Sequence, residues 1–144
     1  MIPAMIFHHI GYAVHSIEAT AKHYSAAGWS LSPITFDPFQ KCNIAFLAKA
    51  GYPCIELVEQ AKDDINHNPN LRGDGNNILN NILKNGVTPY HFCYEVPDIN
   101  RAIIELRKQH YLLLFNPIPA SALDNRPICY LMHPDVGLIE LLQK

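Results

Sequence analysis

The chain has 144 residues, of which 49% are hydrophobic and 17% charged, and its formal net charge is −2. This length and balance predict one globular domain and exclude a disordered chain. The 11 lysine and arginine residues are scattered, whereas nucleic-acid binding requires a basic stripe, so we expect no nucleic-acid partner.

We expect no membrane partner either, because no apolar run approaches the roughly 20 residues of a membrane span. The apolar N-terminus has neither a basic region nor a small-residue cleavage site, so it is not a signal peptide. The four cysteines form no C-x-x-C pair, which favours reduced, buried thiols and a cytoplasmic location.

The first half of the chain predicts the order β-α-β-β-β. Residues 7–14 alternate, which places His9 on one strand face with small side chains. Ser16 is the expected N-cap of a helix that Gly28 ends. Three further strands are predicted at 30–36, 42–48 and 53–59.

The second half repeats this order after a linker. Residues 63–77 are predicted to form a polar loop, and Ile78–Leu83 predict a short amphipathic helix that Gly86 ends. Asp98 is the expected N-cap of the next helix, in the place that Ser16 holds in the first half. Strands are predicted at 90–96, 111–117, 127–131 and 137–142.

Internal repetition is the strongest signal in this sequence. H-x-x-Y-x-V occurs at 9–14 and again at 91–96, and Ile-Glu-Leu surrounds both Glu56 and Glu140, which are 84 residues apart. The repeat predicts an α+β fold in a single domain, residues 1–144. It consists of two βαβββ modules, 5–60 and 89–144, and a linker at 61–88 that holds the short helix.

The repeated histidines and glutamates predict a metal site. Alternation turns Glu56 and Glu140 away from their Ile and Leu neighbours, and an ionised carboxylate in an apolar strand costs several kcal/mol unless it is paired or bound to a metal. A single buried His or Glu is more often held by core hydrogen bonds, but four at equivalent positions favour one shared divalent ion. His8 is a weaker candidate than His9 because it is expected either on the other face of the strand or at the frayed start of the strand. The predicted ligands are His9, Glu56, His91 and Glu140.

In these motifs the chain resembles the vicinal oxygen chelate superfamily, which includes glyoxalase I, methylmalonyl-CoA epimerase, bleomycin-resistance proteins and extradiol dioxygenases. The resemblance runs from His9 to Leu142. It implies an eight-stranded, cupped mixed sheet around a metal, usually in a homodimer, with the four predicted ligands at the family's ligand positions. The linker helix, the second His strand and Leu131–Pro134 are most similar to methylmalonyl-CoA epimerase. Lactoylglutathione lyase is the other candidate.

The resemblance implies a metal-dependent isomerase or lyase that acts on a small molecule. It would remove a proton next to a thioester or hemithioacetal carbonyl, with the enolate stabilised by a divalent metal such as Zn, Ni, Co or Mn. Glu140 is the expected base, assisted by Glu56. Arg126 and Asn125 are candidate substrate contacts, since arginine binds carboxylates and phosphates in pairs of hydrogen bonds, although a solvated turn suits Arg126 equally well.

Two other functions fit parts of the pattern. Epimerases of this family use a second acid opposite the metal-bound glutamate, and residues 42–48 hold no acid, which leaves a non-catalytic binding or resistance protein as an alternative. An Fe(II) extradiol-type dioxygenase is a third possible function. The extra glutamate and the short chain count against it. The sequence also leaves open whether one chain or two close the cup.

Overall fold

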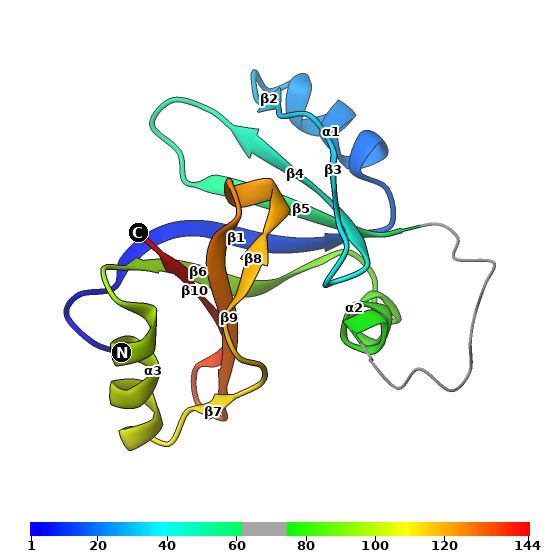
Figure 1. Ribbon diagram of the computed structural model, residues 1–144. Helices are drawn as coiled ribbons and strands as arrows, with labels where there is room; N and C mark the ends of the chain where they lie inside the picture. The colour runs from blue at the N-terminus through cyan, green and yellow to red at the C-terminus, as the bar shows by residue number, and fades with distance from the viewer. Residues whose placement is uncertain (62–74) are drawn as a thin grey trace.

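One mixed sheet forms the centre of the molecule in the computed structural model, which describes residues 1–61 and 75–144 (Figure 1). Most of the polar loop predicted at 63–77 lies outside the described residues. The strands are β1 (Ile6–Val14), β2 (Ser30–Leu31), β3 (Thr35–Asp37), β4 (Cys42–Ala48), β5 (Cys54–Gln60), β6 (Thr88–Val96), β7 (Leu112–Leu113), β8 (Ile118–Ala120), β9 (Arg126–His133) and β10 (Gly137–Gln143). The helices are α1 (Ile17–Ser25), α2 (Gly75–Leu83), α3 (Ile99–Lys108) and the 3-10 turn η1 (Ser121–Leu123).

The sheet joins the two halves of the chain edge to edge. Its order is β2-β4-β5-β1-β6-β10-β9-β7, with β3 paired to β4 and β8 to β9. The central pair, β1 and β6, is antiparallel, and each of them has a parallel partner from its own half, β5 or β10. The predicted α+β fold of two βαβββ modules is therefore confirmed, and both modules of one chain form a single sheet.

The second strand of each module is broken in two, which the sequence did not predict. The runs expected at 30–36 and 111–117 form the short pairs β2–β3 and β7–β8. Pro33 lies in the first gap and Pro117 in the second, and proline has no N–H to donate to a ladder. In the first gap Ser32 makes two hydrogen bonds to Phe46 instead. The Ser32 N–H donates to the Phe46 carbonyl, and the Phe46 N–H donates to Ser32 Oγ. Counting each broken strand once gives the eight strands expected.

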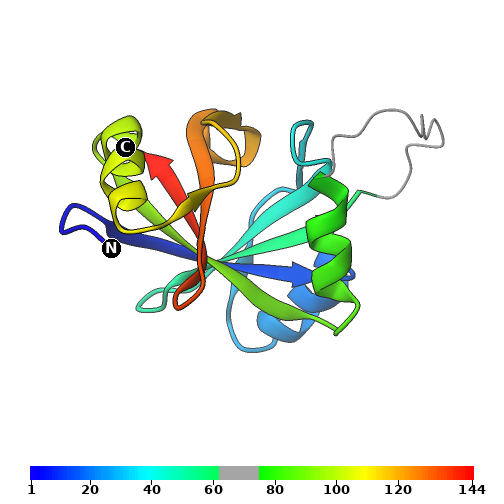
Figure 2. The same cartoon turned by 90° about the horizontal axis from the view of Figure 1, so that it is seen from below.

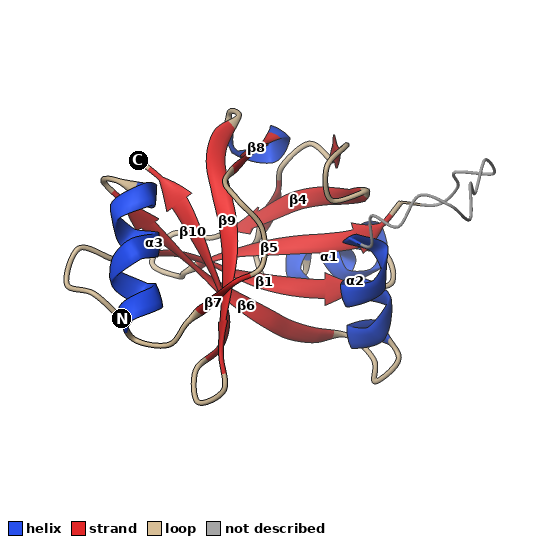
Figure 3. Ribbon diagram, turned by 60° about the horizontal axis from the view of Figure 1, so that its bottom comes forward, coloured by secondary structure: helices blue, strands red, loops and turns tan. Residues whose placement is uncertain are grey.

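Each of α1 and α3 covers one module, and the two helices lie at opposite ends of the sheet (Figures 1 and 3). Ile17 and Ala21 of α1 pack against Leu57 of β5, while Ile103 and Leu106 of α3 pack with the core of the second module. The Ile and Leu residues beside both glutamates therefore face helices, as predicted. The glutamates themselves point to the opposite face.

The helix α2 packs on that opposite face. Its Leu79 contacts the cluster formed by Ala13 and Val58, which alternate onto the side of β1 and β5 that carries His9 and Glu56. Figure 2 shows α2 beside the end of β1. Among the described residues, no helix is long and apolar enough to cross a membrane.

The predicted helix ends are confirmed by their hydrogen bonds. Ser16 Oγ accepts from Ala19 N–H at 3.2 Å, and Asp98 Oδ1 accepts from Arg101 N–H at 3.0 Å. Gly28 and Gly86 both have positive φ, 82° and 99°, the backbone conformation in which glycine ends a helix.

Candidate metal centre

The four predicted ligands come from four consecutive strands at the middle of the sheet. His9 lies on β1, Glu56 on β5, His91 on β6 and Glu140 on β10, in the spatial order β5-β1-β6-β10. Gly11 stands opposite Glu56 on one side and His91 on the other. The register therefore converts four positions that are distant in sequence into one compact group.

The polar atoms of this group face one another inside the protein. His9 Nε2 lies 3.2 Å from His91 Nε2 and 3.4 Å from Glu56 Oε2. His91 Nε2 lies 3.5 Å from Glu56 Oε2 and 3.0 Å from Glu140 Oε2, and the fifth contact, His9 Nε2 to Glu140 Oε2, is 3.9 Å. All four residues are buried, with at most 3% of their surface exposed.

These distances fit a bound divalent ion. Nitrogen and oxygen ligands lie about 2.0–2.2 Å from zinc, so atoms in neighbouring coordination positions are roughly 3.0–3.5 Å apart. One atom from each of the four residues lies within 4.8 Å of all the others. Two carboxylates and two neutral imidazoles carry a net charge of −2, which a divalent cation neutralises in a setting where unpaired charge is costly.

The electrostatics of the group favour the ionised form of Glu56. Burial raises the pKa of Glu56, but His9 and His91 more than offset this and leave that pKa below its usual value. Burial lowers the pKa of His9, and the Glu56 and Glu140 carboxylates more than offset that, so the pKa of His9 is raised. A positive charge between the His9 and Glu56 side chains is therefore favourable, whether a proton or a metal ion carries it.

His91 is positioned by shape. A Cβ added to Gly11 would stand 1.9 Å from His91 Cε1 and 2.2 Å from His91 Nδ1. Its Nδ1 is buried and has no hydrogen-bond partner among the described residues. Only a glycine at position 11 leaves room for this ring. Sequence reasoning recognised Gly11 as small but did not identify this requirement.

His9 is positioned by a hydrogen bond that alternation could not predict. The register of β1 against β6 shifts between Phe7 and His9, a β-bulge that removes His8 from the simple alternation of faces. His8 Nδ1 lies 2.8 Å from His9 Nδ1. His8 is thus beside the cluster and not away from it, which corrects its placement on the other strand face.

Aromatic rings line the group with the same symmetry as the repeat. Phe46 of β4 lies 5.5 Å from His9 between ring centroids, and Tyr130 of β9 lies 5.3 Å from His91. Phe46 and Tyr130 are 84 residues apart, as the two glutamates are. The Tyr130 hydroxyl also donates to Gln40 Oε1 at 3.2 Å, which links the two modules.

The structure places the two predicted substrate contacts at the start of β9. Arg126 Nη1 lies 3.2 Å from Glu95 Oε1, and both side chains are partly exposed. Burial raises the pKa of the Cys93 thiol far above its usual range, and the charge of Arg126 offsets part of this rise. Asn125 has a φ of 57° in the turn before β9.

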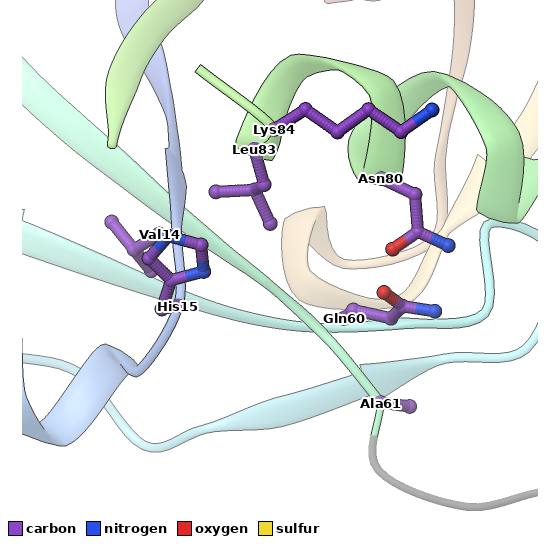
Figure 4. A pocket seen from close by; sticks show the side chains of 7 residues that line it. All are labelled: Val14, His15, Gln60, Ala61, Asn80, Leu83 and Lys84. Carbon is purple, nitrogen blue, oxygen red and sulfur yellow. The ribbon is translucent and has the colours of Figure 1, made fainter. Parts of the chain in front are cut away.

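One cavity adjoins the group, and a larger one lies further along the sheet. One of about 140 Å³ includes His91 and Gly137 in its lining, so it reaches a predicted ligand. The other, of about 630 Å³, opens between α2 and the ends of β1 and β5, where Asn80 and Gln60 lie on opposite sides (Figure 4). None of the four predicted ligands lines this larger cavity.

The fold and the geometry of the candidate metal centre point to a class of protein that sequence comparison identifies. Residues 8–130 match the model of the glyoxalase/bleomycin resistance protein/dioxygenase superfamily. The chain belongs to this superfamily, as its motifs indicated. No curated protein matches its sequence significantly.

Solved structures share the fold over almost the whole chain. Methylmalonyl-CoA epimerase from Mycobacterium tuberculosis is 22% identical, with a TM-score of 0.76 over 99% of this chain and 91% of that one. A hypothetical protein from Bacillus halodurans C-125 is 25% identical, with a TM-score of 0.75 over 98% and 95%. A variant of Streptomyces coelicolor methylmalonyl-CoA epimerase, in complex with 2-nitronate-propionyl-CoA, is 21% identical, with a TM-score of 0.74 over 98% and 95%.

Proposed function

We propose that this protein is a metal-dependent isomerase or lyase that removes a proton next to a thioester or hemithioacetal carbonyl. The observation that carries the proposal is the buried group of His9, Glu56, His91 and Glu140, with polar atoms 3.0–3.9 Å apart. The epimerase structures with CoA compounds support a thioester substrate, and glyoxalase I-like chemistry on a hemithioacetal uses the same kind of site.

The four residues would hold Zn, Ni, Co or Mn, since imidazole and carboxylate ligands suit these borderline ions. When bound, such an ion supplies a positive charge that stabilises an enolate as the proton leaves. His9 and His91 would fix the ion's place in the sheet. The group is buried, and burial from water strengthens each electrostatic contact.

Glu140 is the proposed base. Two histidines lower the pKa of Glu56, which keeps Glu56 ionised and makes it a weaker proton acceptor. The Glu140 carboxylate lies 3.0 Å from His91 Nε2 and 3.9 Å from His9 Nε2, so it contacts one imidazole closely and the other only loosely. It would take the substrate proton and return it, with Glu56 assisting.

Solvent exchange tests this function directly. Protein loaded with Ni, Co or Zn should incorporate deuterium from D₂O into methylmalonyl-CoA, or turn over the methylglyoxal–glutathione hemithioacetal. Chelator-treated protein should do neither, and the same holds for the double variant His9→Ala/His91→Ala, which removes both imidazoles. Inactivity of the loaded protein on both substrates would rule out the proposal.

We further propose that Arg126 and Asn125 contact the substrate, and Arg126 provides the sharper test. Arg126→Ala should raise KM by about 10-fold or more and change kcat little, because a lost charge-assisted hydrogen bond costs about 1.5–3 kcal/mol of binding in ground and transition state alike. Arg101→Ala, at an exposed position on α3, is the control. An unchanged KM would assign Arg126 to its ion pair with Glu95 alone.

A binding protein without catalysis is the second candidate, and one observation favours it. The β4 side chain that packs against His9 is Phe46, so this strand offers no second acid opposite Glu140. Metal-dependent binding of a CoA thioester with no exchange would support this candidate. The homodimer expected from the resemblance also stays a prediction, for which sedimentation of the purified protein is the measurement.

A further inference from the structure

The two histidines of the proposed metal centre are held by different means. The ring of His91 is fixed by the space over Gly11, and its Nδ1 has no partner among the described residues. The ring of His9, which is fully buried, has a partner for its Nδ1 in His8 at 2.8 Å. The His8 and His9 rings stand edge to face, with 74° between their planes and 5.1 Å between their centroids.

The chemistry of imidazole determines the direction of this hydrogen bond. His9 presents Nε2 to the other three residues of the group, and a nitrogen that binds a metal carries no hydrogen. The hydrogen of neutral His9 must then be on Nδ1, and at 2.8 Å it is donated to His8 Nδ1. His8 accepts, so its own hydrogen is on Nε2.

We propose that His8 is a positioning residue for His9, fixing its ring orientation and tautomer through this Nδ1–Nδ1 hydrogen bond. The inference rests on the proposed metal centre but concerns a residue outside its four ligands. Partners that accept the second N–H of a ligating histidine commonly contribute about 10–100-fold to metal affinity. The bulge between Phe7 and His9 is what brings His8 within reach.

A second metal ion is the competing explanation for the same geometry. His8, His9 and Cys93 place one potential ligand atom each within 4.8 Å of one another. However, 2.8 Å between two nitrogens is a typical hydrogen-bond length and is shorter than the roughly 3.0–3.5 Å of two ligands on one ion. The geometry therefore favours a hydrogen bond over a His9-bridged pair of metals.

The test compares metal affinity in matched variants by competition with a coloured chelator, using zinc and cobalt. His8→Ala should weaken binding about 10–100-fold. His8→Asn, whose Oδ1 can accept at nearly the position of the lost nitrogen, should recover most of that loss. His23→Ala, at an exposed histidine of α1, should bind as the unchanged protein does.

A measurement on the unchanged protein keeps the proposal testable if His8→Ala does not fold. Proton NMR of the zinc-loaded protein should show a slowly exchanging imidazole N–H from His9 Nδ1, and this signal should disappear in His8→Ala. Absence of the signal from the unchanged protein, or equal zinc affinity in His8→Ala, would overturn the inference. Binding of two zinc ions, one of them lost in Cys93→Ser, would overturn it in favour of a second metal. If the unchanged protein binds no metal, the proposed function fails instead.

Discussion

Glu140→Gln should lower the rate of deuterium exchange by about 10²–10⁴-fold, the usual contribution of a general base. Glutamine has the same shape as glutamate and keeps an oxygen that can face the metal, but its amide does not take up a proton. Glu140 approaches His91 at 3.0 Å and is almost fully buried. The variant should therefore retain much of its metal while losing its chemistry.

The measurement must separate the base from the ligand. Exchange is followed at saturating zinc or cobalt, with the bound metal determined by elemental analysis on the same sample. Glu56→Gln should affect metal affinity more than rate, because the lowered pKa of Glu56 makes it a weak proton acceptor. Glu105→Gln, at an exposed position paired with Lys108, is the control. A larger rate loss in Glu56→Gln than in Glu140→Gln would reverse the proposed roles.

The fold could be predicted because the repeat and the strand alternation agree. A strand has a side-chain period of two, so the Ile-Glu-Leu motifs at 55–57 and 139–141 fixed which side chains face the helices. The breaks between β2 and β3 and between β7 and β8 were not predicted, although Pro33 and Pro117 mark both. Whether a proline ends a strand or only interrupts it depends on the neighbouring strand, which the sequence does not show.

The four proposed ligands were found from the sequence because they recur at equivalent positions, and the structure brings them into contact. The residues that hold the two imidazoles were missed for a physical reason. His8 was assigned by alternation to the other face, and a bulge removes it from that alternation. Position 11 needs glycine because the His91 ring occupies the space where a Cβ would stand. His91 lies on β6, 80 residues further along the chain.

Gly11→Ala should nearly abolish metal binding, with a loss of affinity on the order of 100-fold or more. The new Cβ would lie 1.9 Å from His91 Cε1 and 2.5 Å from His91 Nε2, so the ring must move by more than the roughly 0.5 Å that a functional site tolerates. The backbone itself accepts alanine, because Gly11 is not among the glycines with positive φ. The effect should therefore come from the clash with His91 alone, and chelator competition measures it.

A double-mutant cycle in the metal-free protein isolates that clash. Gly11→Ala alone should destabilise the fold by about 1–3 kcal/mol, the usual cost of overpacking, measured by urea unfolding. In the His91→Ala background the same change should be neutral or stabilising, since an alanine loses less conformational freedom on folding than a glycine does. An equal cost in both backgrounds would show that position 11 requires glycine for a reason other than the His91 ring. Retention of metal affinity in Gly11→Ala would show that the ring has room to move without leaving the site.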